Sequence, residues 1–251
     1  VFLFFIPILL TPDKLIWSFS HLGSDIENRH WGDFTRYAEY LRQWRIPLWD
    51  SSVALGHPLP GDLDVVFGYP LIVLFVFLPT AFAFNVYDAL HVFIAGASMF
   101  YLLRLSYQID LPSSLFGALA FAFMPKFVAH LAVGHIGLMP ALAWVPLLWL
   151  GFQRGMEGSY RWAAVAGAIM AMQVPLHIQI PYYAAAIASA FWLWRLIPSL
   201  WHKQWLNVRQ LIVMYAVFLT AFVLIGASTL IPLMETLPYN SRVDLSLADA
   251  N

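Results

Sequence analysis

The chain alternates between apolar runs close to the length of a membrane span and shorter polar connections. A transmembrane helix needs roughly 20 consecutive, mostly apolar residues. Runs of this kind cover residues 1–19, 86–105, 113–131, 138–153, 161–176, 181–197 and 209–233. The pattern predicts an all-α fold, a polytopic transmembrane helix bundle of about seven spans that forms a single domain over residues 1–251.

A long polar loop over residues 20–65 separates the first span from the rest. Ser24 and Glu27 have the spacing of a capping box, in which each side chain bonds to the other's backbone N–H group. Apolar and aromatic side chains then recur at helical spacing: Trp31, Phe34, Tyr37, Leu41 and Trp44. This pattern predicts an amphipathic surface helix whose aromatic stripe lies in the headgroup region of a membrane.

The apolar stretch 65–84 follows this loop and is interrupted by Gly68, Pro70 and Pro79. The pieces between these residues are too short to span a bilayer. We therefore expect a re-entrant or interfacial segment here.

The distribution of basic residues predicts which end of the bundle faces the cytoplasm. With seven spans, one side receives nearly all positive charges of the short loops: Arg104, Arg154, Arg161, Arg195, Lys203 and Arg209. Lys and Arg accumulate in cytoplasmic loops of membrane proteins. The loop 20–65 is therefore expected to be extracytoplasmic.

Composition agrees with a membrane protein, because only 11% of the residues are charged and 61% are hydrophobic. The net charge of −1 provides no basic field for a nucleic-acid partner. The chain has no cysteine, which excludes disulfides and thiolate metal ligands. It begins inside an apolar run and ends in a polar one, so we interpret it as truncated at both ends, a part of a longer polypeptide.

Asp25 is the first candidate for chemistry, at the start of the surface helix. A carboxylate at the membrane face can accept a proton from a hydroxyl group. An acid in the first helical turn also interacts favourably with the helix dipole, without any catalytic role. Asp62 and Asp64 offer hard oxygen ligands for a divalent metal, with a solvated turn as the alternative.

A second group of candidates lies at the outer ends of the later spans. Lys126, within an apolar run, either binds an anion or extends its ammonium group to the interface. His130, His135 and His177 can bind a ligand or serve the structure alone. Arg242 can grip a phosphate or anchor a helix end.

An ordered set of short motifs resembles the YfhO-like family of bacterial membrane proteins. The motifs are Gly23-Ser24-Asp25, Leu41-Arg42-x-x-x-Ile46-Pro47-Leu48-Trp49-Asp50, Gly56-x-Pro58, Tyr69-Pro70, Gly134-His135, Trp144-x-Pro146-Leu147, His177-x-Gln179 with Tyr182-Tyr183, Pro232-x-x-Glu235 and Ser241-Arg242. That family is similar to the GT-C group of glycosyltransferases, which share a seven-helix module and take a sugar from a polyprenyl-phosphate carrier. The resemblance implies a bacterial inner (plasma) membrane protein with Asp25 as the catalytic or acceptor-activating residue. It also implies Lys126, His135 and Arg242 as candidates for binding the carrier phosphate.

Two functions therefore remain open at this stage. One is a membrane glycosyltransferase-like protein, whose partners are the lipid bilayer and a polyprenyl-phosphate-linked sugar donor. No cofactor is assigned to it, and a divalent metal is the one candidate. The other is a non-catalytic membrane scaffold or accessory subunit that binds other membrane subunits. A transporter is disfavoured, because its polar residues would lie near mid-membrane rather than at one face.

Overall fold

The computed structural model of the chain describes residues 6–8, 10–11, 13–15, 24–46, 48–51, 56–62 and 66–239. Most of the predicted first span lies outside these ranges, as do Asp64 and Arg242. Within them the fold is helical, apart from β1 (Trp49–Asp50) and β2 (His57–Pro58), which pair antiparallel. The predicted all-α class is thus confirmed.

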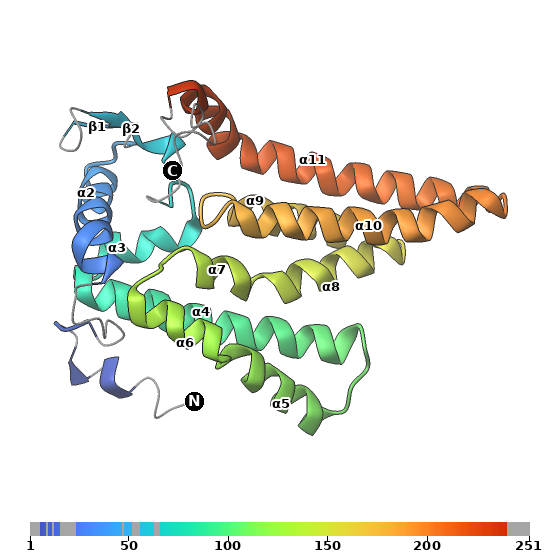
Figure 1. Cartoon of the computed structure of the whole chain (residues 1–251), viewed down its shortest axis with the longest axis horizontal. Coiled ribbons are helices and arrows are strands. Elements are labelled where there is room, and N and C mark those ends of the chain that lie inside the picture. The colour runs from blue at the N-terminus through green and yellow to red at the C-terminus, as the bar shows by residue number, and fades with distance from the viewer. Residues whose placement is uncertain are drawn as a thin grey trace, which may run out of the picture.

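The bundle consists of helices that run side by side along its long axis (Figure 1). They are α4 (Thr80–Leu105), α5 (Leu111–Ala122), α6 (Pro125–Val133), α7 (Leu138–Ala143), α8 (Val145–Met156), α9 (Tyr160–Gln173), α10 (Gln179–Trp201) and α11 (Trp205–Thr236), which ends in the 3-10 turn η4 (Leu237–Tyr239). Among the described residues, four stretches are long and apolar enough to cross a membrane: α4, α5 with α6, α10 and α11. The chain is therefore a multi-pass membrane protein by helix length and composition, whereas seven spans are not confirmed.

Two of the predicted spans that are missing from these four, 138–153 and 161–176, correspond to short helices. α7 and α8 divide the run 138–156 at Trp144, before Pro146, and have 6 and 12 residues. α9 has 14 residues, fewer than the roughly 20 that a straight span requires. Proline also divides α5 from α6 at Pro125, because its ring removes a backbone donor from the helix.

The centre of the bundle is closely packed because small residues let helices approach one another. A Cβ atom on Gly167 of α9 would collide with the carbonyl group of Phe218 on α11. On Gly155 of α8 it would lie 2.9 Å from the Cβ of Ala163 on α9. Close backbone approach at small residues is typical of helix packing in membranes, where dispersion contacts replace the hydrophobic effect.

A helical segment lies at one end of the bundle, at the left in Figure 1. It consists of the π-helical turn η1 (Ile26–His30) and α2 (Trp31–Arg42). Its start is the predicted capping box: the backbone N–H of Glu27 donates to Ser24 Oγ, and that of Ser24 donates to Glu27 Oε2, both at 3.3 Å. The helix therefore begins where the sequence predicts it.

Part of the aromatic stripe of α2 packs inside the protein, where the prediction places it in the headgroup region. Phe34 and Tyr37 are buried, and the ring of Phe34 lies 4.8 Å from that of Phe75 and 5.4 Å from that of Phe84. Both partners belong to the segments that lead into and begin α4. The expectation that this stripe lies among headgroups is thus wrong for Phe34 and Tyr37, because packing against the bundle covers them.

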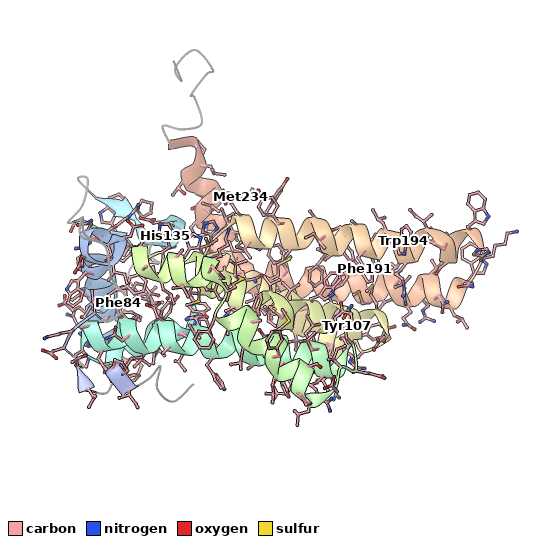
Figure 2. All side chains as sticks on the ribbon, turned by 60° about the horizontal axis from the view of Figure 1, so that its bottom comes forward. Phe84, Tyr107, His135, Phe191, Trp194 and Met234 are labelled. Carbon is pink, nitrogen blue, oxygen red and sulfur yellow. The ribbon has the colours of Figure 1, made fainter. Side chains whose placement is uncertain are left out.

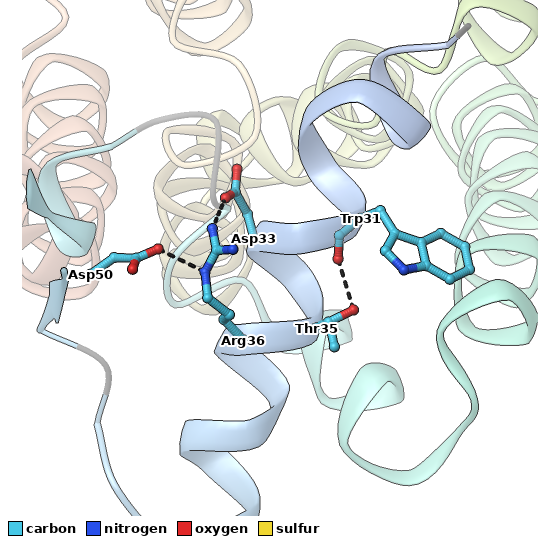
Figure 3. Close-up of polar contacts among 5 residues, drawn as sticks. All are labelled: Trp31, Asp33, Thr35, Arg36 and Asp50. Atoms are coloured by element: carbon cyan, nitrogen blue, oxygen red, sulfur yellow. Dashed lines mark hydrogen bonds and ion pairs between the residues drawn. The ribbon is translucent and has the colours of Figure 1, made fainter. Parts of the chain in front are cut away.

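Arg36 links α2 to the strand β1 through an ion pair with Asp50 (Figure 3). Its Nη2 donates to Asp33 Oδ1 at 2.6 Å, as the three-residue spacing predicts, and its Nε donates to Asp50 Oδ2 at 2.9 Å. Burial raises the pKa of the Asp33 carboxyl, while the Arg36 guanidinium acts in the opposite direction. The loop is therefore folded against α2 by a charge-assisted contact.

The apolar stretch before the bundle contains no long helix of its own. It passes through the 3-10 turn η3 (Pro70–Val73) and the single turn α3 (Leu74–Phe77), and α4 begins at Thr80. Arg42 of α2 binds the end of this segment: its guanidinium donates hydrogen bonds to the carbonyl groups of Phe75 and Val76. Of the predicted re-entrant or interfacial segment 65–84, residues 80–84 belong to α4. A re-entrant path for residues 66–79 is not confirmed.

Candidate functional site

The Asp25 carboxylate contacts the His135 imidazole at the end of the bundle that carries α2. Asp25 Oδ2 lies 3.2 Å from His135 Nε2, and each side chain is about half exposed. Asp25 follows the N-cap Ser24, and His135 follows Gly134, the C-cap of α6. Two segments more than 100 residues apart in the sequence thus bring an acid and an imidazole together.

Gly134 makes this approach sterically feasible. Its φ of +81° is a left-handed conformation that ends α6 and that side chains rarely adopt. A Cβ atom here would lie 2.9 Å from the backbone nitrogen of Ile26 and 3.1 Å from the Cβ of Ser24. The end of α6 therefore sits directly against the capping box that positions Asp25.

His130 extends the pair into a chain of three groups. Its Nδ1 lies 2.7 Å from Nδ1 of His135, so one of the two nitrogens must donate and the other accept. If Nε2 of neutral His135 carries the proton that faces Asp25, its Nδ1 is the acceptor and His130 Nδ1 is the donor. Asp25 then accepts from an imidazole that is itself oriented by a second imidazole.

A cavity of about 190 Å³ opens beside this chain. The residues around it are Asp25, His30, Val66, His135, Ile136, Gly137, Leu138, Leu176 and His177. They come from the start of the helical segment, from the stretch before η3 (Val66), from the turn between α6 and α7 with the first residue of α7, and from the turn between α9 and α10. Figure 2 labels His135 at this end of the bundle, beside α2.

Gly137 allows the two turns that line the cavity to pack against each other. A Cβ atom at this position would collide with the carbonyl group of Leu176, the residue before His177. Glycine is therefore needed for His135 and His177 to border one cavity. Both turns are short, so the position of each imidazole depends on this backbone contact.

The predicted site residues divide into three groups in the structure. Asp25, His135 and His177 border the cavity, and His130 adjoins it through His135. The ammonium group of Lys126 acts electrostatically on His130 but does not border the cavity. Arg242 lies outside the described residues.

The predicted metal pair does not form a ligand cluster in the described part of the chain. Asp62 ends the 3-10 turn η2 (Leu59–Gly61), where its backbone N–H donates to the Leu59 carbonyl, and Asp64 lies outside the described residues. Across the described ranges, no three His, Asp or Glu side chains are placed to bind a metal ion.

Two residues with functional character are absent from the sequence-based candidates. His30 is buried and borders the cavity, but its position in an amphipathic helix gives no local signal. Asp88 is 3% exposed within α4. An acid inside an apolar span is a signal in itself, because membrane interiors strongly disfavour charge.

Comparison of the chain with protein-family models, with curated proteins and with solved structures finds no match. The fold and the site together define a class, a multi-pass helical membrane protein with an acid–imidazole cluster at one end.

Proposed function

We propose that the chain is a membrane glycosyltransferase that takes a sugar from a polyprenyl-phosphate carrier at the end of the bundle that carries α2. The observation that supports this most is the contact of Asp25 with His135 at the rim of a cavity lined by three histidines. A carboxylate, several imidazoles and a concave surface are what a transfer from a phosphorylated carrier requires.

In this proposal Asp25 acts on the acceptor and the imidazoles act on the carrier. The acceptor hydroxyl attacks the anomeric carbon of the sugar, and its proton passes to Asp25. The bond between that carbon and the phosphate oxygen breaks, so the polyprenyl phosphate leaves with the electron pair. For this step the His130–His135 pair carries one extra proton, so that its positive charge, together with the imidazole of His177, stabilises the negative charge of the leaving phosphate.

The proposal includes the membrane topology. The chain crosses a bacterial plasma membrane seven times, with the short helices α7 to α9 among the crossings, and residues 20–65 face the outside. The ends of the bundle support this orientation. The connections α4–α5, α8–α9 and α10–α11, which carry Arg104, Arg154, Arg161, Lys203 and Arg209, lie at the end opposite α2 (Figure 1).

The volume of the cavity favours a second function. Small-molecule sites usually enclose about 300–1,000 Å³, and the cavity beside Asp25 has about 190 Å³. A scaffold or accessory subunit needs no larger cavity. In that case the Asp25–His135 contact serves only to hold the helical segment against α6.

The experiment compares Asp25→Asn with Asp110→Asn in proteoliposomes. Asp110 is a matched control, because it caps α5 at the opposite end of the bundle and asparagine also caps helices well. A panel of polyprenyl-phosphate-linked hexoses serves as donor, and the release of polyprenyl phosphate is measured. We expect Asp25→Asn to slow release about 10²- to 10⁴-fold, the usual contribution of a general base, and Asp110→Asn to leave it unchanged.

Equal rates in the two variants would remove Asp25 from catalysis. A well-folded wild-type protein that neither binds nor turns over any donor of the panel would favour the scaffold. Melting curves of all three proteins establish that each is folded.

A further inference from the structure

A second hollow lies on the flank of the bundle, away from the Asp25 cavity. It is a groove between α4 and α5 with a volume of about 450 Å³. Its principal residues are Phe93, Gly96, Ala97, Phe100, Ala118 and Phe123, and nearly all of its surface is apolar. It shares no residue with the cavity beside Asp25.

The groove opens outward rather than into the core. Its edges are formed by aromatic side chains that are largely exposed, such as Phe93 at 61% and Tyr101 at 51%. Its floor is shallow because α4 and α5 approach closely at Gly96, where a Cβ atom would lie 3.5 Å from that of Ala122. Both helices belong to membrane-spanning stretches, so the groove faces the hydrocarbon of the bilayer.

Lys126 follows this groove closely along the chain. Lys126 follows the groove residue Phe123 by three positions, at the start of α6, and its side chain is exposed. It makes no ion pair with any residue in the described part of the chain. A lysine within an apolar span costs free energy unless an anion or the interface receives its charge.

We propose that the α4–α5 groove and Lys126 form a binding site for one anionic phospholipid. An acyl chain lies in the groove, and the headgroup phosphate accepts hydrogen bonds from the ammonium group of Lys126. Apolar volume beside a cation that has no ion pair among the described residues is complementary to an anionic amphiphile. Basic sites between transmembrane helices bind anionic lipid headgroups in this way.

A phospholipid is the occupant because the groove is open to the bilayer. Bulk phospholipid is by far the most concentrated amphiphile there, and mass action fills an open site with the abundant ligand. This inference goes beyond the proposed glycosyltransferase function and does not depend on it. It assigns Lys126 to a resident lipid instead of to the sugar carrier.

The test measures lipid-dependent melting of the full chain in detergent. Phosphatidylglycerol is titrated against wild type, Lys126→Met and Ala97→Phe, with phosphatidylcholine as the neutral probe. Ala97→Phe fills the groove, and Ala190→Phe adds the same ring to an exposed alanine of α10. Lys203→Met removes a cation from the opposite end of the bundle.

We expect phosphatidylglycerol to raise the Tm of wild type more than phosphatidylcholine does. Lys126→Met should weaken phosphatidylglycerol binding about tenfold or more, in line with the loss of a charge-assisted hydrogen bond. It should weaken the phosphatidylcholine response less, because the choline group of that lipid offsets the charge of its phosphate. Ala97→Phe should lose the response to both lipids. Ala190→Phe and Lys203→Met should behave as wild type.

Should Ala97→Phe fail to fold, Ala97→Leu fills part of the groove with less volume and takes its place. Equal responses to phosphatidylglycerol in wild type and Lys126→Met would overturn the proposal. So would displacement of phosphatidylglycerol by equimolar polyprenyl phosphate, which would return Lys126 to the carrier. Unchanged lipid responses in both groove variants would likewise overturn it.

Discussion

The hydroxyl group of Tyr69 lies 2.6 Å from Nε2 of His91, and both side chains are buried. The tautomer follows from the other nitrogen, because His91 Nδ1 lies 2.7 Å from the carbonyl of Tyr87, which can only accept. Nε2 is therefore an acceptor and Tyr69 the donor. The same hydroxyl accepts from Trp144 Nε1 at 2.8 Å, so one phenol joins the segment before α4 to α4 and to the junction of α7 and α8.

Tyr69→Phe is expected to destabilise the protein by about 2–4 kcal/mol. The substitution keeps the ring but leaves the His91 acceptor and the Trp144 donor unpaired in a buried site, each at a cost of about 1–3 kcal/mol. Burial raises the pKa of the Tyr69 phenol above its ordinary value, so the group remains a donor at all accessible pH values. Thermal unfolding in detergent measures the effect.

Tyr107→Phe is the matched control for this change. The Tyr107 hydroxyl also accepts from a tryptophan, Nε1 of Trp149 at 3.3 Å, but the Tyr107 residue is 50% exposed. Its loss should cost less than about 0.5 kcal/mol. Combining Tyr69→Phe with His91→Leu should cost less than the sum of the single changes, since both partners are then removed together. Additive effects would show that the two side chains are not coupled.

Gly137→Ala should destabilise the end of the bundle that carries Asp25. Its methyl group would collide with the carbonyl of Leu176, and backbone displacement of this kind costs about 1–3 kcal/mol. Gly96→Ala is the control, because its Cβ meets Ala122 at an ordinary 3.5 Å and alanine favours a helix interior. We expect a lower Tm for the first variant and an equal or higher Tm for the second. The reverse order would mean that the two turns are not in contact.

Local signals in the sequence account for much of this end of the molecule. The capping box of Ser24 and Glu27 and the Asp33–Arg36 pair are contacts over three residues, which spacing alone specifies. The placement of Asp25, His135 and His177 at one end follows from counting spans. His91 lies within the predicted span 86–105, and hydrogen bonds to Tyr69 and Tyr87 satisfy both of its ring nitrogens.

Contacts between distant segments are what the sequence does not specify. Burial of Phe34 depends on the rings of Phe75 and Phe84, which no pattern within α2 indicates. Tyr69 bonds to residues 22 and 75 positions away, so its role has no local signature. Apolar runs alone also do not distinguish a continuous span from a pair of short helices divided by proline, as at Trp144 and Pro146.

The stability contributed by Asp110 should depend on pH in a defined direction. Hydrogen bonds from Ser113, including its backbone N–H at 3.2 Å, lower the pKa of the Asp110 carboxyl below its ordinary value. A lowered pKa in the folded state means that the stabilisation is present above the unfolded value of about 3.9 and is lost as pH falls through the folded value.

The Tm of wild type should therefore exceed that of Asp110→Ala at pH 7, and this difference in Tm, the gap, should narrow progressively below pH 4. Melting curves of the two proteins at a series of pH values measure this gap. Glu157→Ala at the same end of the bundle controls for the loss of a carboxylate, because Glu157 pairs with Arg154 at 3.1 Å instead of capping a helix N-terminus. A gap that stays constant down to pH 2 would assign the stabilisation to packing instead of to the ionised cap.

The proposed sidedness of the membrane can be tested with single cysteines, since the chain has none of its own. Ser51 follows β1 at the end of the bundle that carries Asp25, and Ser159 precedes α9 at the opposite end. Gln108 lies between α4 and α5 and is exposed. In intact cells, a membrane-impermeant maleimide should label Ser51→Cys, whereas Gln108→Cys and Ser159→Cys should react only after permeabilisation.

This pattern has a physical cause in the charges of the short connections. The basic residues of the short connections lie at the end opposite α2, and Lys and Arg in short loops are retained on the cytoplasmic side. These residues are Arg104, Arg154, Arg161, Lys203 and Arg209.

Labelling of all three cysteines with the opposite sidedness would invert the bundle and place Asp25 in the cytoplasm. Outside labelling of Ser159→Cys alone would show that α7 and α8, which are short and divided at Trp144, do not carry the chain across the membrane. Protection of both Ser159 and Gln108 in intact cells would support a crossing through α5 and α6 followed by a return through α7 and α8, in which two short helices in succession replace one continuous span.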